Sequence, residues 1–334
     1  PSTYDSYIYL FSGITVDLNW PSRQTLYELN QPDYQWDPIG SMTEQPGVGT
    51  PFIVNVESGD LPETISFGDS WSALDGNFTF DGPNFTESPE NPDNFFLLGN
   101  PHPIALDFCE FSGGDIGTTA YFWNPEANSG NGDYLSLNCA APEQVHIAPF
   151  QSFWVWTIDS NLDVQIPEEA YLEDQEEGYF KESKEANRPL AEGLLSLNVK
   201  SQDEQFTGTT RILFSKDAST GLDRFDSPKL NPAGLAPEWL SLHSVGEDGR
   251  RYAYQSLPIK NGDDEALRVP MDIQTTHAGF YTLTWSLPQE EVNREFFLRD
   301  HQTDEVMELK QGDSYRVEVA ATHPSPDHPQ RAGE

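Results

Sequence analysis

A strict alternation of apolar and polar residues near the C-terminus sets the class of fold. In residues 281–287, four large apolar side chains alternate with threonine and serine, and the segments 195–199 and 315–319 repeat the pattern. Successive side chains of a β-strand point to opposite faces of its sheet, so each segment buries one face and exposes the other. Several such strands, separated by turn signals such as Glu247-Asp248-Gly249, predict an antiparallel β-sandwich.

A rigid turn interrupts another apolar segment, whose residues 95–108 read FFLLGNPHPIALDF. Gly99 tolerates the positive φ of a tight turn, while Pro101 and Pro103 fix their own φ and hold the residues before them extended. A proline has no N–H to donate to a β-ladder. The sequence therefore places this turn at the end of a strand or at the edge of a sheet.

Two stretches of the first half share an order of motifs. In each, an aromatic strand, around Tyr27 or Tyr121, is followed by a proline-containing turn and an apolar strand. The two tyrosines are 94 positions apart. This spacing predicts a degenerate internal repeat of two related β units, at about 1–60 and 95–165.

Composition divides the chain further. A sharp rise in glutamate after 165 predicts an acidic linker at 166–192. The predicted organisation is a tandem β-repeat region at 1–165, that linker, a second β-sandwich domain at 193–321, and a terminal linker at 322–334. The fold class predicted for the chain is all-β, with tandem antiparallel β-sandwich domains of immunoglobulin-like or jelly-roll-like type.

Several of these segments resemble the region that precedes the sorting domain in large secreted cargo proteins of the type IX secretion system, found in Bacteroidota- and Rhodothermota-type bacteria. Residues 96–108 fill the place of that family's W-N-L-[IV]-G-N-P-[YF]-P-x-x-[IV]-D-W signature. Further segments that match the family are 121–125, 147–155, 210–214, 220–230, 257–259 and 279–283. The resemblance implies export to the cell surface or medium, and a sorting domain beyond 322–334 that this sequence does not contain.

Charge narrows the possible partners. The 334 residues carry a formal net charge of −37, which disfavours binding to nucleic acid or to an anionic membrane. Aromatic residues make up 12% of the chain, so it is expected to fold, because disordered acidic chains are poor in them. Repulsion among the negative charges of the chain is best tolerated where salt screens it. The charge therefore favours a halophilic organism, with an ordinary marine bacterium as the alternative.

The two cysteines, Cys109 and Cys139, flank the strand around Tyr121. In an exported protein they are expected to form a disulfide, and the alternative is two buried free thiols. Nothing accompanies them in the sequence that would complete a zinc site.

Two sets of side chains are candidates for ligand binding. Trp154 and Trp156 point to one face of their strand and could form a platform for stacking a sugar, or belong to a sandwich core. Asp217, Asp223 and Asp226 could supply oxygen ligands to calcium, or Asp223 and Asp226 could cap their turn. Calcium is the one cofactor that the sequence suggests.

Motifs that mark enzymes are missing from the sequence, including His-Glu-x-x-His, Gly-x-Ser-x-Gly and Cys-x-x-Cys. The sequence contains no run of eighteen apolar residues, so it predicts no membrane-spanning helix. The sequence thus predicts a non-catalytic secreted or cell-surface module for structure or adhesion, whose partners are other extracellular proteins or itself. Two alternatives stay open: a subunit of an extracellular filament or sheath, in which a strand at 4–11 completes a neighbour's sheet, and a polysaccharide-binding accessory region of a larger hydrolase.

Overall fold

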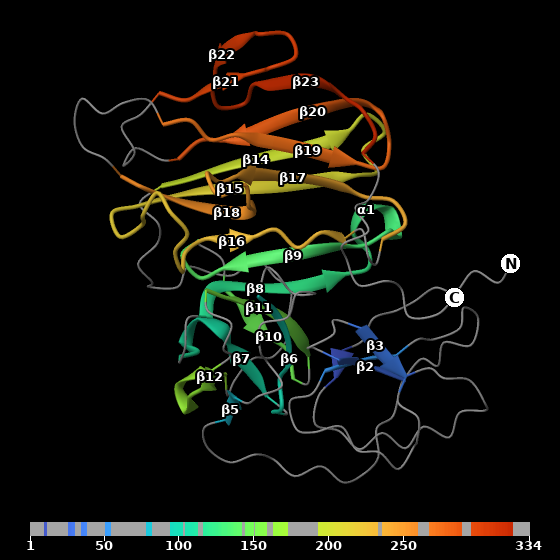
Figure 1. Ribbon diagram of the computed structural model, residues 1–334, viewed down its shortest axis with the longest axis vertical. Helices are drawn as coiled ribbons and strands as arrows, with labels where there is room; N and C mark the ends of the chain where they lie inside the picture. The colour runs from blue at the N-terminus through green and yellow to red at the C-terminus, as the bar shows by residue number, and fades with distance from the viewer. Residues whose placement is uncertain are drawn as a thin grey trace, which may run out of the picture.

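Figure 1 presents the computed structural model of the chain, in which strands form two bodies. The all-β prediction is confirmed, since the described residues contain a single short α-helix, α1 (Ala127–Gly130). The structure describes residues 10–11, 26–30, 35–38, 51–54, 78–81, 94–102, 104–112, 116–141, 144–149, 151–158, 163–172, 193–232, 236–259, 267–288 and 295–322.

Two sheets of the N-terminal half have the same strand order. The first is ordered β1-β4-β2-β3 and the second β6-β11-β8-β9, and every pair in both is antiparallel. The first comprises β1 (Leu10–Phe11), β2 (Leu26–Asn30), β3 (Gln35–Pro38) and β4 (Phe52–Val54). The second comprises β6 (Phe95–Gly99), β8 (Ile116–Asn124), β9 (Asp133–Asn138) and β11 (Ser152–Thr157).

The registers of these sheets also correspond. One row of the first sheet pairs Ile53 with Leu10 on one side and with Tyr27 on the other. The matching row of the second sheet pairs Trp154 with Leu97 and with Tyr121. Tyr27 and Tyr121, the residues on which the predicted repeat is aligned, thus occupy equivalent places in the two sheets.

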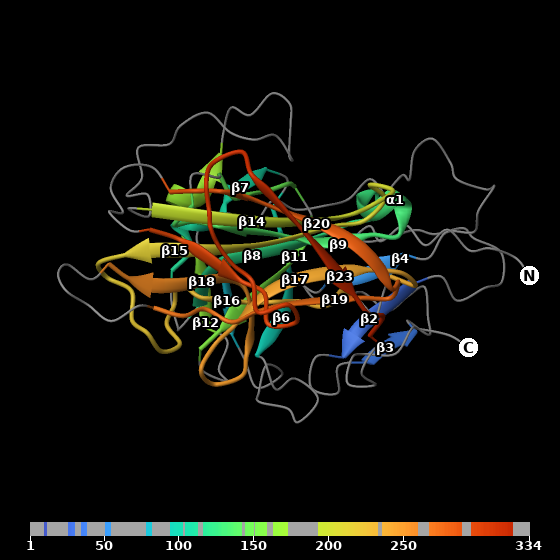
Figure 2. The ribbon, with the colours of Figure 1, turned by 90° about the horizontal axis from the view of Figure 1, so that it is seen from above.

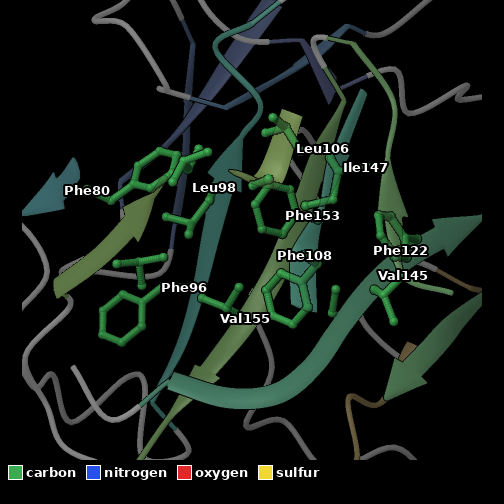
Figure 3. Close-up of a cluster of buried hydrophobic side chains, with 14 residues drawn as sticks. Phe80, Phe96, Leu98, Leu106, Phe108, Phe122, Val145, Ile147, Phe153 and Val155 are labelled. Carbon is green, nitrogen blue, oxygen red and sulfur yellow. The ribbon is translucent and has the colours of Figure 1, made fainter. Parts of the chain in front are cut away.

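A second layer covers one face of the second sheet. It contains β10-β7-β13 and the pair β12-β5. Between the layers lies an apolar cluster that includes Phe96, Phe122, Phe153 and Leu106, and Figure 3 shows their side chains converging. The strands of this layer are β5 (Phe78–Asp81), β7 (Ala105–Asp107), β10 (His146–Ile147), β12 (Asp163–Ile166) and β13 (Tyr171–Leu172), with the 3-10 turns η1 (Phe108–Glu110) and η2 (Glu168–Ala170).

The Gly-Asn-Pro-His-Pro turn follows β6, which is an edge strand of its sheet. The buried side chain of Asn100 organises it, since its Nδ2 donates to the carbonyls of Ile104 and Ala148 at 2.9 and 2.8 Å, and its Oδ1 accepts from the His102 N–H. The turn therefore lies at a strand end, as its prolines predict.

The start of the expected acidic linker belongs to the N-terminal body. Tyr171 pairs with Leu106 of β7, and its hydroxyl lies 3.3 Å from Nε2 of the buried His102. Residues 173–192, the rest of the expected linker, lie outside the described residues, as do 323–334.

The C-terminal body is built on one curled sheet of eight strands, ordered β19-β17-β18-β15-β14-β20-β23, with β16 paired to β18. Leu197, Leu283 and Trp285 are among the apolar side chains that fill the inside of the curl. The strands are β14 (Gly193–Ser201), β15 (Thr207–Ser215), β16 (Ser227–Pro228), β17 (Leu240–Val245), β18 (Arg251–Pro258), β19 (Met271–Thr275), β20 (Gly279–Ser286) and β23 (Ser314–Val319), and a separate hairpin joins β21 (Phe297–Arg299) to β22 (Val306–Glu308).

One strand pair departs from the antiparallel prediction. β15 and β18 run parallel, with Arg211 opposite Tyr254 and Phe214 opposite Leu257. The chain between them, 216–250, carries β16 and β17 and supplies the long crossover that parallel neighbours need. The sheet is therefore mixed, because the alternation of side chains fixes the face of a strand but not its direction.

The two bodies meet where β8 and β9 lie beside β16 (Figure 1). Viewed from above, strands of the C-terminal sheet lie over β8, β9 and β11 (Figure 2). Several buried polar side chains lie at this junction, among them Thr119, Asn138 and Ser227.

Candidate functional site

The two tryptophans of β11 lie in the junction. Trp154 is 6% exposed and Trp156 is 1% exposed, and both pack in a cluster that Leu230 of the C-terminal body completes. Stacking on a sugar needs an exposed ring face, so the predicted platform is wrong. The alternative, that these side chains belong to a core, is what the structure has.

The three aspartates considered as calcium ligands are not brought together as a ligand set. Among the described residues there is no group of three or more His, Cys, Asp or Glu side chains placed to hold a metal ion. Asp223 instead accepts hydrogen bonds from the N–H groups of Ser219 and Phe225, at 2.8 and 2.9 Å. The calcium prediction is thereby corrected, because these carboxylate oxygens face N–H donors in the capping role given as the alternative.

Asp226 fixes the same loop from inside the body. Its carboxylate accepts from the N–H groups of Ser256, at 2.7 Å, and Asp223, at 2.9 Å. Burial raises the pKa of Asp226 to about 7, because a charged carboxylate is disfavoured away from water. Asp217 takes no part in this arrangement, and its own N–H donates to the hydroxyl of Ser215.

This aspartate loop docks on the N-terminal body through its backbone. The carbonyl of Arg224 accepts from the Thr118 N–H at 3.0 Å, and the carbonyl of Phe225 accepts from the Asn138 side chain at 3.3 Å. The loop that the sequence suggested as a calcium site therefore serves as a contact between the bodies.

A buried hydrogen-bond network continues this contact. Asn138 Nδ2 donates to the hydroxyls of Thr119 and Ser227, and these two hydroxyls bond to each other across the junction. Tyr121 donates its hydroxyl to the Pro228 carbonyl at 2.8 Å. All four side chains are buried, so separating the bodies would exchange these hydrogen bonds for bonds to water.

Cys109 and Cys139 are joined in a disulfide, as expected of an exported protein. It links η1 to the residue that follows β9, and both sulfurs belong to the edge of the N-terminal core. The bond thus ties the strand that borders the C-terminal body to the interior of its own body.

A pocket of about 170 Å³ opens beside this network, between β9 and the strands β15 and β18. Its walls carry charged, hydroxyl and aromatic groups from both bodies. The residues that supply these groups include Asp133, Tyr134, Thr209, Arg211, Lys229 and Tyr254.

Opposite charges face each other across the pocket. Burial raises the pKa of Asp133 and lowers the pKa of Lys229, while the attraction between the two charges opposes both shifts. Burial and the Asp133 charge together raise the pKa of Tyr134 well above its usual range. The phenol therefore stays neutral at all ordinary pH values.

Arg211 closes one wall of the pocket. Its Nη1 donates to the Tyr254 hydroxyl at 2.6 Å, and its guanidinium lies 5.0 Å from the centre of that ring. Tyr254 in turn donates to the carbonyl of Ser136 in the other body, at 3.2 Å. A cation of the C-terminal body is thus held in position through a contact with the N-terminal body.

A serine, a histidine and an aspartate also meet on β17 and β19. Ser241 Oγ lies 3.4 Å from Nδ1 of His243, whose Nε2 lies 3.4 Å from Asp272. Ser241 and His243 are only 2% and 1% exposed, so no substrate carbonyl can reach the hydroxyl. Burial lowers the pKa of His243, and the contact with His243 lowers the pKa of Asp272, which fits a structural polar pair.

Sequence reasoning missed the pocket, because its charged residues are far apart along the chain. Asp133 precedes Lys229 by almost a hundred positions, and Arg211 lies on a strand that looks like any other half-buried strand. The available signal was scarcity: lysine and arginine together number 18 against 55 acidic residues, so each cation is a rare residue in this sequence.

Comparisons with family models, curated proteins and solved structures find no match to this chain. The resemblance to type IX secretion cargo thus stays a prediction from the sequence. Within the part of the chain that the structure describes, no helix has the length and apolar character to cross a membrane.

Proposed function

We propose that this chain is a non-catalytic secreted or cell-surface module for structure or adhesion, whose two β bodies act as one rigid unit. The observation that carries the proposal is the buried network at the junction. Tyr121, Asn138 and Ser227 hydrogen-bond across it, and separating the bodies would lose these bonds to water and expose the apolar cluster around Trp154 and Trp156.

Further features support the same role. The disulfide favours an oxidising compartment outside the cell. A charge of −37 keeps such a module soluble through repulsion between like-charged surfaces, and salt screens that repulsion. In this proposal the layered N-terminal body and the curled C-terminal sheet are tandem β-sandwich domains of immunoglobulin-like or jelly-roll-like type, carried as a rod that presents its loops.

The experiment is negative-stain microscopy with light scattering on the purified chain, in molar salt and after dialysis to low salt. A rigid display module should give single particles of one shape and the mass of a monomer. Particles with two separately oriented bodies would contradict the proposal, because the junction would then not hold.

The alternative of a filament subunit is favoured by one edge. β3, at the end of the first sheet, pairs only with β2 among the described residues, and such an edge can accept a neighbour's strand. The edge of β19 is different, because Thr275 exchanges hydrogen bonds with Thr322 of the same chain. Ordered polymers in the microscope would support this second role.

The filament alternative must also change its donor strand. The sequence suggested that a strand at 4–11 completes a neighbour's sheet, but Leu10 and Phe11 pair with β4 of their own chain. Residues 4–9 lie outside the described residues. Donation of this segment would therefore require it to leave its own sheet first.

A further inference from the structure

We propose that the pocket between the two bodies binds a small zwitterion, in the form of a free α-amino acid. This site goes beyond the display role proposed above and does not depend on it, since a filament subunit would have the same pocket. It also differs from the tryptophan platform, which is buried.

The pocket holds a cation and an anion that do not touch each other. Lys229 comes from the C-terminal body and Asp133 from the N-terminal body, and both line the pocket. Their charges attract each other, but the two side chains do not form a salt bridge. A ligand that bridges the gap can therefore meet a positive group at one end and a negative group at the other.

Lys229 can bind the carboxylate of such a ligand. Its Nζ donates to the Thr209 carbonyl at a long 3.5 Å. An ammonium group has three N–H donors, so at least two remain for a ligand carboxylate, and hydrogen bonds between two charged groups are the strong ones.

Asp133 can bind the ammonium group. Its Oδ1 accepts from the Tyr134 N–H at 2.7 Å, and the carboxylate also interacts with the Asn128 side chain. A carboxylate has about four lone-pair sites, so acceptor capacity remains for a ligand N–H. In an α-amino acid the ammonium and the carboxylate are carried by one carbon, which suits a pocket that offers both partners in a small space.

Arg211 does not enter the charge expected of the ligand. It is already engaged by the protein, with its Nη1 bonded to the Tyr254 hydroxyl at 2.6 Å. The charges of Lys229 and Asp133 cancel, and a zwitterion matches them because it has no net charge. The chain as a whole carries −37, which repels an approaching anion but not a zwitterion.

Size and wall chemistry limit the amino acid further. The pocket volume of about 170 Å³ is well below the roughly 300–1,000 Å³ of pockets that hold drug-sized ligands. Ala127, Leu135 and Ala253 add apolar surface to the walls. This lining fits a small apolar side chain, so alanine is the probe.

The test is calorimetric titration of the full chain with L-alanine and two analogues of nearly the same shape, at neutral pH. L-lactate has a hydroxyl in place of the ammonium, and L-alaninamide has a neutral amide in place of the carboxylate. Salt of about 1 M shortens the Debye length to about 3 Å and so screens the repulsion between lactate and the acidic surface. We expect saturable binding of alanine that is at least tenfold tighter than the binding of either analogue. Equal affinity for either analogue, or no binding of alanine by the folded protein, would overturn the assignment.

Variants assign each end of the ligand to its partner. Lys229→Met should weaken alanine binding by about 10- to 100-fold, the usual effect of losing a hydrogen bond between charged groups, and should abolish the preference over alaninamide. Asp133→Asn should abolish the preference over lactate instead. The matched control is Lys310→Met, since Lys310 is 66% exposed and does not line the pocket.

Circular dichroism monitors folding, and the readout is a ratio of affinities within one protein. If one variant misfolds, the other still tests its own end of the ligand, and the series on the unmodified chain tests both ends. Unchanged ratios in folded Lys229→Met or folded Asp133→Asn would place the binding elsewhere and refute the site. Single-particle images from the display experiment are independent of this result, so the two proposals can fail separately.

Discussion

The N-terminal body divides its strands among several small sheets, whereas the C-terminal body places eight in one. A curled sheet of eight strands encloses its own core and needs little else. Small sheets of two to four strands cannot each enclose a core, so they depend on layers and cross-links. The disulfide, the buried Asn100 turn and the aromatic cluster all belong to the body that needs them.

The second sheet of the N-terminal body also shows a contrast between its faces. Phe153 and Val155 of β11 point into their own body, while Trp154 and Trp156 point toward the other. One strand is therefore buried on both faces by different partners. The junction is in this sense a second core, which neither body completes alone.

The largest effect should come from Trp156→Ala. A buried tryptophan replaced by alanine costs about 3–5 kcal/mol of stability, because a cavity is left behind. Chemical denaturation followed by tryptophan fluorescence measures the loss, and we expect the unfolding transitions of both bodies to move to lower denaturant. A loss below 1 kcal/mol would mean that the junction is not a core.

The matched control for that variant is Trp285→Ala. Trp285 is also buried, but it lies inside the C-terminal curl, where its Nε1 donates to the Lys310 carbonyl. Its loss should destabilise the C-terminal body and leave the N-terminal transition where it was. If both variants shifted both transitions equally, the two cores would not be distinct.

The next effect concerns pH and the aspartate loop. The folded state raises the pKa of Asp226 from 3.8 to about 7, so it holds a proton that the unfolded state releases. The resulting stability is complete below pH 4, falls as the pH rises to about 7, and is constant above that. Three pKa units correspond to a loss on the order of 4 kcal/mol.

Thermal unfolding between pH 4 and 8 in molar salt measures this loss in the wild type and in Asp226→Asn. The asparagine keeps an oxygen that can accept from the Ser256 N–H, but it does not titrate in this range. We expect its stability to change less between pH 4 and 7. Parallel curves for the two proteins would assign the slope to the general acidity of the chain instead.

Much of the fold follows from the sequence, because alternation was visible wherever one face is solvated. β14, β20 and β23 lie on the segments that alternate, and the prolines placed the turn after β6. β11 was misjudged for the opposite reason. Residues 153–156 form an unbroken apolar run, which indicates burial on both faces, and that signal outweighs the shared side of Trp154 and Trp156.

The pocket could not have been predicted in the same way. Its residues become neighbours only after two bodies dock, and no local pattern encodes docking. Lys229 follows β16, a strand of two residues. Both residues of β16 hydrogen-bond to the other body, Ser227 to Thr119 and Pro228 to Tyr121. Short motifs describe strands and turns well, but a site shared between bodies depends on their relative placement.

The disulfide should affect one body only. Replacing Cys109 and Cys139 with alanine removes a cross-link over 30 residues, which costs roughly 3–4 kcal/mol in the chain-entropy model. The N-terminal transition should move to lower denaturant, while the cysteine-free C-terminal body keeps its midpoint. Reduction of the wild type should reproduce the shift, and an equal shift of both transitions would show that the bodies unfold together.

The smallest effect tests the polar part of the junction. Tyr121→Phe removes the hydroxyl that donates to the Pro228 carbonyl and leaves that acceptor without this donor, which costs about 1–3 kcal/mol. The ring keeps its packing against Phe95, so the effect isolates the hydrogen bond.

Tyr254→Phe is the paired variant, because its hydroxyl bonds the Ser136 carbonyl from the opposite body. If the junction is cooperative, the double variant should lose less than the two single losses combined, since the first break already loosens the second contact. Strictly additive losses from denaturation midpoints would mean that the two tyrosines hold the bodies together independently.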